Sequence, residues 1–351
     1  MKDNGQFVRN AWYVAAWSKE VGRSLMARTL LGQNVVLYRK QDGTPVALTD
    51  RCPHKLAPLS RGELVGDLVQ CGYHGMQYDG AGRCVHVPGQ PPIPPAARVQ
   101  SYPLVEKYNL LWIWMGDVAL ADPAGIPDIA HHGRSGWGLV DGQYLHIRTN
   151  YLNLTDNLVD PAHTSYVHKR TIGSAGGADV PVELEHSDKR VTAFRWIENS
   201  EPVPIMKTFG NFTGNVDRWQ YYHLLLPTNS YVDFGAVPAG GARDEAGKDS
   251  GFRSFTYSLL TPETAGSTHY FWLHLRNYAV GAAEVDADIA RLYQLTFEED
   301  RDILEAIQVE QDKTGVIEFV RLAIDRAPQR ARMLIQRMIE AEQPAPKVSA
   351  G

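Results

Sequence analysis

The chain has few cysteines, no long apolar run and no strong charge of either sign. Only 3 of its 351 residues are cysteine, which excludes a small disulfide-stapled scaffold. The 35 basic and 40 acidic residues leave a net charge of −5, so nothing indicates a nucleic-acid or anionic-membrane partner. No apolar stretch approaches the roughly 18 residues of a membrane span, and no secretory signal opens the chain. We expect a cytoplasmic protein that acts on small molecules.

The length allows two domains, and the pattern of the sequence changes near residue 120. The predicted fold class is α+β: a β-rich domain over 1–118, a linker over 119–140, and a second domain over 141–351 with strands between helices. Individual elements are predicted as strands over 35–38, 46–48, 109–116, 190–196 and 269–274, helices over 152–169 and 284–311, and a loop over 239–251.

Two short motifs each pair a cysteine with a histidine. Cys52 and His54 form a C-x-H pair, and Cys71 and His74 form a C-x2-H pair. Two thiolates suit iron bonded to sulfide, and two imidazoles on a second iron complete the ligand set of a Rieske [2Fe–2S] centre. A Cys2His2 zinc site accepts the same side chains, but zinc motifs usually pair like with like, so the mixed pairs favour the cluster. Cys84 has no partner motif and is predicted to be structural.

Two histidines in the second part, His163 and His168, are candidate ligands of another metal. On a regular helix a five-residue step leaves two side chains roughly 140° apart, so they converge only if the helix is distorted. Pro161 gives a reason for distortion, because proline interrupts the hydrogen bonds of a helix. Two histidines alone are weak evidence, and they need a third ligand.

A third ligand is found on the helix predicted over 284–311. Asp300 falls within about 20° of the centre of an apolar stripe that includes Ile289, Ile303 and Ile307. A carboxylate on such a stripe is costly unless it is paired or binds a metal; a buried salt bridge or a cap is the alternative. With the two histidines, Asp300 completes a 2-His-1-carboxylate set, typical of Fe(II) sites that bind dioxygen. The neighbouring acids are predicted on the solvated face or its edge: Glu298, Glu299 and Asp302.

These motifs, in this order, resemble those of the Rieske non-haem iron oxygenases. The resemblance is to the oxygenase components of the vanillate O-demethylase, dicamba O-demethylase and toluenesulfonate methyl-monooxygenase group, and it covers nearly the whole chain. In this family a β-rich Rieske domain precedes a helix-grip catalytic domain, in which a curved antiparallel sheet holds a long helix. The segments that carry the resemblance are 10–15, 52–54, 57–59, 71–75, 88–90, 112–114, 156–168, 217–220, 261–264 and 297–300.

The resemblance also implies roles for individual residues. Asp160 resembles the aspartate that links a cluster histidine of one subunit to an iron-binding histidine of the next, which implies a homotrimer. Asn157 matches a polar residue near the iron, although a helix-surface amide explains it as simply. The implied ligands are Cys52, His54, Cys71 and His74 for the [2Fe–2S] cluster, and His163, His168 and Asp300 for the mononuclear Fe(II).

The implied function is that of a monooxygenase that acts on the methyl or methoxy group of a small aromatic compound. A methoxy substrate would yield a phenol and formaldehyde. Because the chain has no glycine fingerprint for a nucleotide, a separate flavin/iron–sulfur reductase is expected to deliver electrons from NAD(P)H. Ser258 stands where the dicamba enzyme's pattern has a histidine, which argues against the same substrates. Candidate pocket residues are Trp219, Tyr221, His223, Tyr231, Phe255, Tyr257, Trp272 and His274.

Other functions use only part of this evidence. Within the family, ring hydroxylation and N-demethylation are the alternative reactions. A Rieske electron carrier would need the first four ligands but not the triad, and a zinc-stabilised binding protein would need neither iron site.

Overall fold

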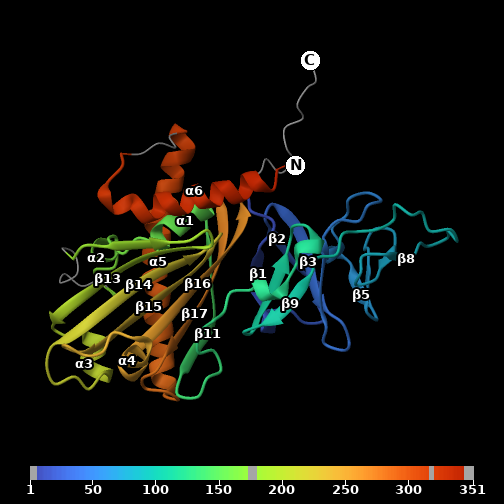
Figure 1. Cartoon of the computed structure of the whole chain (residues 1–351). Helices are drawn as coiled ribbons and strands as arrows, with labels where there is room; N and C mark the ends of the chain where they lie inside the picture. Colours follow the sequence, from blue (N-terminus) through green and yellow to red (C-terminus); the bar gives the residue numbers. More distant parts are fainter. Residues whose placement is uncertain (1–5, 173–179, 316–319, 344–351) are drawn as a thin grey trace. The chain divides into compact units, whose positions relative to one another are not determined.

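The computed structural model describes residues 6–172, 180–315 and 320–343, and the chain divides into two compact units (Figure 1). The first unit contains the chain up to Ile126, Thr261–Ala265 and the residues from Ala341 onward. The second contains Pro127–Leu260 and Gly266–Glu340. A β-rich first part and a second part of strands and helices confirm the predicted fold class. The boundaries predicted at 118 and 140 stay predictions.

The first unit is built from three small antiparallel sheets, and the three strands predicted in it are confirmed. The strands predicted over 35–38 and 46–48 form and pair with each other, with Val35 opposite Thr49. The apolar run 109–116 contains a fully buried strand, Leu110–Trp114. The sheets are ordered β1 (Trp12–Trp17), β10 (Leu110–Trp114), β9 (Leu104–Lys107); β2 (Met26–Leu30), β3 (Gln33–Arg39), β4 (Pro45–Thr49); and β5 (Glu63–Val65), β6 (Leu68–Gln70), β7 (Gln77–Tyr78), β8 (Cys84–His86).

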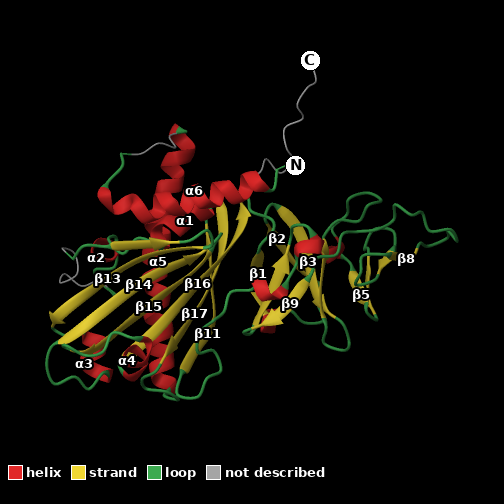
Figure 2. Ribbon diagram, in the orientation of Figure 1, coloured by secondary structure: helices red, strands yellow, loops and turns green. Residues whose placement is uncertain are grey.

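The second unit is built on one seven-stranded sheet, which Figure 2 shows in yellow. All strand pairs with a described register are antiparallel, as expected for strands joined by hairpins. The predicted strands over 190–196 and 269–274 are confirmed within longer strands. The order across the sheet is β11 (Gly138–Ile147), β17 (Ser267–Arg276), β16 (Phe252–Thr264), β15 (Asn229–Pro238), β14 (Val216–Leu225), β13 (Arg190–Ser200), β12 (Glu183–His186).

Helices α1 (Tyr151–Leu158), α5 (Ala283–Thr314) and α6 (Arg326–Ala341) pack on one face of this sheet, and we call it the helix face. The long helix α5 lies behind the sheet in Figure 1 and confirms the helix predicted over 284–311. The helix predicted over 152–169 is interrupted, and forms α1 and α2 (Thr164–Val167). The remaining helices are α3 (Pro204–Phe209), α4 (Glu245–Ser250) and α6.

These three remaining helices were not predicted. α4 lies inside the predicted loop over 239–251, and the Asp244 carboxylate begins it by accepting a hydrogen bond from the Gly247 backbone N–H at 2.8 Å. α6 is strongly amphipathic, and its buried residues include Ala331 and Leu334. Among the described residues, no helix is long and apolar enough to cross a bilayer.

The buried face of α5 differs from the predicted stripe in its last turns. Asp300 is buried, as predicted, but Ile303 and Ile307 are 45% and 39% exposed. The final turns of α5 contact α1 through amide side chains: the Asn153 amide of α1 donates a hydrogen bond to Gln311 of α5 at 2.8 Å. In these turns α5 therefore meets α1 through polar side chains, and the two isoleucines lie outside the contact.

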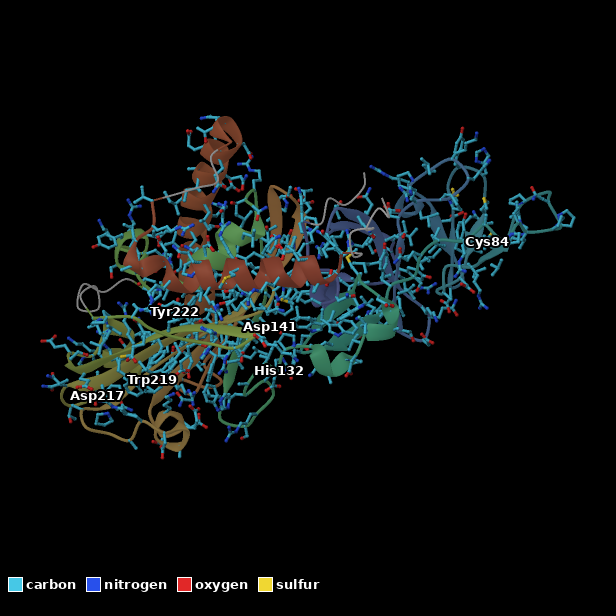
Figure 3. The ribbon with its side chains drawn as sticks, turned by 45° about the horizontal axis from the view of Figure 1, so that its top comes forward. Cys84, His132, Asp141, Asp217, Trp219 and Tyr222 are labelled. Atoms are coloured by element: carbon cyan, nitrogen blue, oxygen red, sulfur yellow. The ribbon has the colours of Figure 1, made fainter. Side chains whose placement is uncertain are left out.

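Side chains alternate between the helix face and the opposite, outer face along each strand. On β17, Trp272 packs on Phe297 of α5 with ring centroids 5.4 Å apart, so this side chain lies on the helix face. Figure 3 labels Tyr222 and Trp219 of β14, which are an odd number of residues apart. Tyr222 packs with residues of α6, whereas Trp219 pairs with Trp196 on the outer face.

The alternation divides the eight aromatic pocket candidates between the two faces. Trp272 and His274 lie on the helix face, and both rings contact Tyr293 of α5. On the outer face, ring contacts join the other six to one another or to aromatic neighbours: Trp219, Tyr221, His223, Tyr231, Phe255 and Tyr257. Only two candidates therefore face the helix that carries Asp300.

Candidate metal centres

Three predicted ligands, His163, His168 and Asp300, come together in the second unit. The Nε2 atoms of the histidines are 3.3 Å apart, and they lie 3.6 and 3.3 Å from Oδ1 of Asp300. Ligand atoms bound about 2.1 Å from one metal and at right angles stand roughly 3 Å apart. The three atoms could therefore hold one metal ion from one side, which would leave its other coordination positions to ligands from outside the triad.

The break between α1 and α2 lets the two histidines converge. His163 precedes the single helical turn of α2 and His168 follows it, so neither sits inside a regular helix. Their rings are 5.1 Å apart and inclined at 74°. The segment around Pro161 is non-helical, and the Asp160 carboxylate accepts a hydrogen bond from the Ala162 backbone N–H at 2.7 Å. The distortion predicted from the proline is present.

The other nitrogen of each imidazole is held by an acceptor. His163 Nδ1 donates to the backbone carbonyl of Asp160, and His168 Nδ1 contacts Oε2 of Glu299 at 3.1 Å. Because a carbonyl and a carboxylate can only accept, Nδ1 carries the proton in both rings and Nε2 keeps its lone pair. The two lone pairs face each other across 3.3 Å with the Asp300 oxygen beside them, an arrangement that a metal ion satisfies.

Glu299 is a functional residue that the sequence argument missed. Its angle on the helix places it at the edge of the buried stripe, where an acid is usually solvated. In the structure its carboxylate accepts from Thr171 Oγ1 at 2.8 Å as well as from His168. The signal that could have found it is the adjacent pair of acids Glu299-Asp300. The two carboxylates contact opposite nitrogens of one imidazole, because Asp300 lies at Nε2 of His168 and Glu299 lies at Nδ1.

Asn157 lies against the iron-binding carboxylate and is no free surface amide. Its Nδ2 donates to Oδ1 of Asp300 at 3.0 Å, the same oxygen that faces both histidines. This hydrogen bond fixes the orientation of the carboxylate.

Burial and charge act differently on the two histidines. Burial lowers the pKa of His163, which keeps the ring neutral and its Nε2 available as a ligand. Burial also opposes the charged form of His168, but hydrogen bonds with Asp300 and Glu299 outweigh it and raise the pKa of this ring. With a metal ion bound at Nε2 of each ring, both imidazoles would be neutral, and together with one carboxylate they suit a divalent first-row metal such as Fe(II).

The cysteine motifs of the first unit lie on two loops with the same backbone pattern. The Cys52 backbone N–H donates to the Ala57 carbonyl, and the Cys52 carbonyl accepts from Leu56. In the second loop, Cys71 repeats the pattern with Met76 and Gly75. Leu56 and Gly75, at the matching positions, both have left-handed φ values, +60° and +72°. The two motifs are therefore structural equivalents.

The two loops bury their thiols and expose their imidazoles. Cys52 and Cys71 are 1% and 2% exposed, whereas His54 and His74 are exposed with ring centroids 4.5 Å apart. Within the described ranges, His163, His168 and Asp300 form the one set whose ligand atoms lie close enough for a single ion. The four loop side chains do not form such a set, which disfavours a tetrahedral zinc and fits two irons that separate thiolates from imidazoles.

The surroundings of Gly72 and Cys84 explain these two residues of the first unit. Gly72 is required by a neighbouring chain segment, because a Cβ there would meet the Arg61 carbonyl oxygen at 2.8 Å. Cys84, which Figure 3 labels, is half-buried on β8. Its Sγ lies 3.4 Å from the His86 carbonyl oxygen. This contact agrees with a structural role.

Asp160 lies at the iron-binding histidine and borders a surface hollow. Its carboxylate is 3.9 Å from Nδ1 of His163. The hollow, of about 350 Å³, is also lined by Val182, Arg195 and Ala327. Burial raises the pKa of Asp160.

Comparison with known proteins identifies both units. Residues 11–103 match the Rieske [2Fe-2S] domain, and residues 147–341 match the vanillate O-demethylase oxygenase C-terminal domain. The chain is 37% identical over 341 residues to the iron-sulfur subunit of the toluene-4-sulfonate monooxygenase system of Comamonas testosteroni, covering 96% of this chain and 98% of that one. It is 36% identical over 342 residues to the oxygenase component of dicamba O-demethylase of Stenotrophomonas maltophilia, covering 96% and 99%.

A solved structure agrees over the same length. Dicamba monooxygenase bound to 3,6-dichlorosalicylic acid superimposes with a TM-score of 0.87 at 34% identity, covering 96% of this chain and 99% of that one.

Proposed function

The chain belongs to the vanillate O-demethylase group of Rieske non-haem iron oxygenases, and from that premise we propose that it hydroxylates a methyl or methoxy substituent of a small aromatic compound. It is an oxidoreductase with a Rieske [2Fe–2S] domain and a His-His-Asp mononuclear iron site. As an oxygenase component it works with a reductase on another polypeptide. We propose that this reductase contains flavin and an iron–sulfur centre and takes its electrons from NAD(P)H.

The observation that carries the proposal is the convergence of His163, His168 and Asp300 on one metal position. When bound there, iron supplies dioxygen activation, and the cluster supplies electrons singly. O-demethylation balances as one methoxy arene, one O2, two electrons and two protons giving a phenol, formaldehyde and water. The residues of this chain hold the three ligand atoms, keep both Nε2 lone pairs free and shield the site from water.

We propose that Asp160 joins the two kinds of metal centre across a subunit boundary. Its carboxylate is close to His163 and borders the hollow described above, so a histidine from a neighbouring subunit can reach it. A path between subunits requires a closed ring, and the homotrimer is the form we propose. Asn157 is proposed as the residue that orients Asp300, through the hydrogen bond at 3.0 Å.

The function is tested with the complete chain loaded with iron, a compatible reductase and NADH or NADPH. A panel of methoxy- and methyl-substituted aromatic compounds is scored for formaldehyde and for hydroxymethyl products. Formaldehyde from a methoxy compound, in step with oxygen and electron consumption, supports O-demethylation. Products hydroxylated on the ring, or amines that lose an N-methyl group, would instead support the two alternative reactions.

The alternatives outside oxygenase chemistry have distinct signatures. An electron carrier would accept electrons from the reductase but leave every aromatic compound unchanged. A zinc-stabilised binding protein would lack the visible absorption of a Rieske cluster and would contain zinc in place of iron. We also propose that the protein is cytoplasmic, since its three cysteines form no disulfide, as is usual in a reducing compartment.

A further inference from the structure

Among the buried polar atoms on the helix face of the sheet that have no hydrogen-bond partner within the described structure, three belong to neutral side chains of β15 and β17. They are Oγ of Ser230, Nε1 of Trp272 and Nε2 of His274. These side chains are at most 1% exposed. Buried donors and acceptors in native proteins are nearly always paired, so three unpaired atoms on one face require an explanation.

Two of the three atoms belong to rings that contact α5, the helix that carries Asp300. Trp272 and His274, on β17, lie 6.1 and 4.6 Å from the ring of Tyr293 on α5. Seven residues further along that helix is Asp300, about 10 Å away along the helix axis. Phe297, between them in sequence, packs on Trp272 at 5.4 Å. Both rings therefore contact the helix that carries the iron-binding carboxylate, within two turns of it.

The chemistry of the two nitrogens favours an acceptor group on the ligand. The indole N–H of Trp272 can only donate. Nδ1 of His274 is 2.9 Å from Oγ1 of Thr256, and if that hydroxyl donates, Nε2 carries the proton and is a second donor. Burial lowers the pKa of His274 to about 3, so the ring is neutral. Recognition here therefore depends on neutral hydrogen bonds.

No free cation stands beside these donors on β17. Arg276, two residues beyond His274 and fully buried, has its guanidinium 2.6 Å from the Asp286 carboxylate. An acid group on the ligand would thus meet donors at Trp272 and His274 before it met a charge. Ser230 faces the same side from β15, opposite Ser258 on the next strand.

We propose that Trp272 and His274 bind an oxygen-acceptor substituent, a carboxylate or a sulfonate, on the aromatic substrate and thereby point the opposite end of the ring at the iron. Ser230 contacts the same substrate from the side. This inference rests on the proposed function, because it assigns residues that position the substrate for that reaction. It makes Trp272 and His274 specificity-determining residues on a strand that carries no metal ligand.

A purely structural role for the unpaired atoms makes the opposite prediction. If Trp272 only fills the core, its unpaired N–H is a burden, and replacement by an apolar ring leaves ligand affinity unchanged. If it binds substrate, Trp272→Phe keeps most of the packing and removes the donor, so affinity falls while thermal unfolding stays close to that of the wild type.

The test is equilibrium binding by calorimetry under anaerobic conditions, with the complete iron-loaded protein and no reductase. The probes are 4-methoxybenzoate, 4-methylbenzenesulfonate and 4-methylanisole, which lacks the acid group. We expect Trp272→Phe to weaken binding of a probe that carries an acid by roughly tenfold, and Ser230→Ala to weaken it severalfold. Binding of 4-methylanisole should not change. The carboxylate and sulfonate probes show which of the two acids the site accepts.

The matched control is Trp196→Phe, on the outer face, where Nε1 already donates to the Tyr221 hydroxyl at 2.9 Å. This variant should bind every probe as the wild type does. Equal affinity of wild type, Trp272→Phe and Ser230→Ala for both acids overturns the inference, and so does equal affinity of the wild type for 4-methylanisole and the acids. Turnover is measured separately: acids that bind through Trp272 but never react contradict the proposed function and leave the binding site standing.

Discussion

The cluster loops expose their imidazoles and bury their thiols, whereas the iron triad buries His168 and Asp300 and leaves His163 only slightly exposed. His54 and His74 lie at the surface, while the side chains of His163, His168 and Asp300 are 15%, 2% and 5% exposed. An exposed imidazole can meet a partner and pass an electron through it. A buried triad can bind dioxygen and a substrate while water is excluded. The difference separates electron entry from chemistry, although each region uses two histidines.

The two regions also differ in how their ligands are held. The loops fix Cys52 and Cys71 through backbone hydrogen bonds within five residues. The triad depends on side chains distant in the sequence: Asn157 holds Asp300, and Glu299 holds His168. Substitutions near the loops should therefore affect the cluster through the local backbone. Substitutions near the triad should affect the iron through the side chains that hold its ligands.

The largest effect is expected from Cys52→Ser, which removes a buried thiolate of the cluster. Both cluster irons and the visible absorption should be lost, and turnover should fall by roughly a thousandfold or more because electrons no longer enter. The mononuclear iron should remain. Cys84→Ser is the matched control, since the Cys84 thiol contacts the His86 carbonyl and is no predicted cluster ligand, and this variant should keep the full spectrum. Retention of the cluster in Cys52→Ser would contradict the assignment.

Asp300→Ala should produce the reverse pattern. Turnover should fall by about a thousandfold or more because the iron loses its carboxylate ligand, while the absorption of the cluster is unchanged. Asp302→Ala, an exposed position on the same helix, should be active. Rates are measured as product formed per chain with saturating reductase. Full activity of Asp300→Ala would show that another carboxylate binds the iron.

A smaller effect is expected from Glu299→Gln. The amide cannot hold the Nδ1 proton of His168 as a carboxylate does, so iron affinity should weaken by roughly 10- to 100-fold. Chelator competition, followed as loss of the mononuclear iron with the cluster intact, gives that affinity. Glu298→Gln, the preceding residue, contacts Gln294 and serves as the control. If both variants hold iron equally well, Glu299 does not position the ligand.

The sequence predicted the loops and the triad by different means, and with different limits. Ligand pairs such as Cys52 and His54 are local, so their spacing carried the prediction. Asp300 was found because helical periodicity places it among apolar residues. Glu299 was missed because the same periodicity puts it at the solvated edge, and its partner, His168, lies 131 positions away.

The sheet shows why the substrate pocket could not be predicted. Alternation tells that Trp272 and His274 share a face, and that Trp219 and Tyr221 share a face. The pair that lies against the long helix is decided by the strand pairing and by where the chain crosses the sheet. Neither is encoded locally in the sequence. The exposed Ile307 illustrates the same limit, because the polar surface of α1 decides which side of α5 is buried.

The smallest effect concerns the equivalence of the two cluster loops. Gly75→Ala should destabilise the cluster by about 1–2 kcal/mol, since φ is +72° and the added Cβ would lie 3.0 Å from Cγ of Pro88. Leu56→Gly, at the matching position, relieves the same backbone conformation and should cost little or stabilise slightly. Thermal bleaching of the cluster band compares the two. A reversed order would show that the loops are not equivalent.

The most direct test of the account is the iron content of the fully loaded wild-type chain beside that of Asp300→Ala and Cys52→Ser. Two separate centres, one of two irons and one of a single iron, predict about three irons per chain for the wild type, about two for Asp300→Ala and about one for Cys52→Ser. A wild type with two irons, unchanged in Asp300→Ala, would contradict the triad as a metal site and leave an electron carrier in its place.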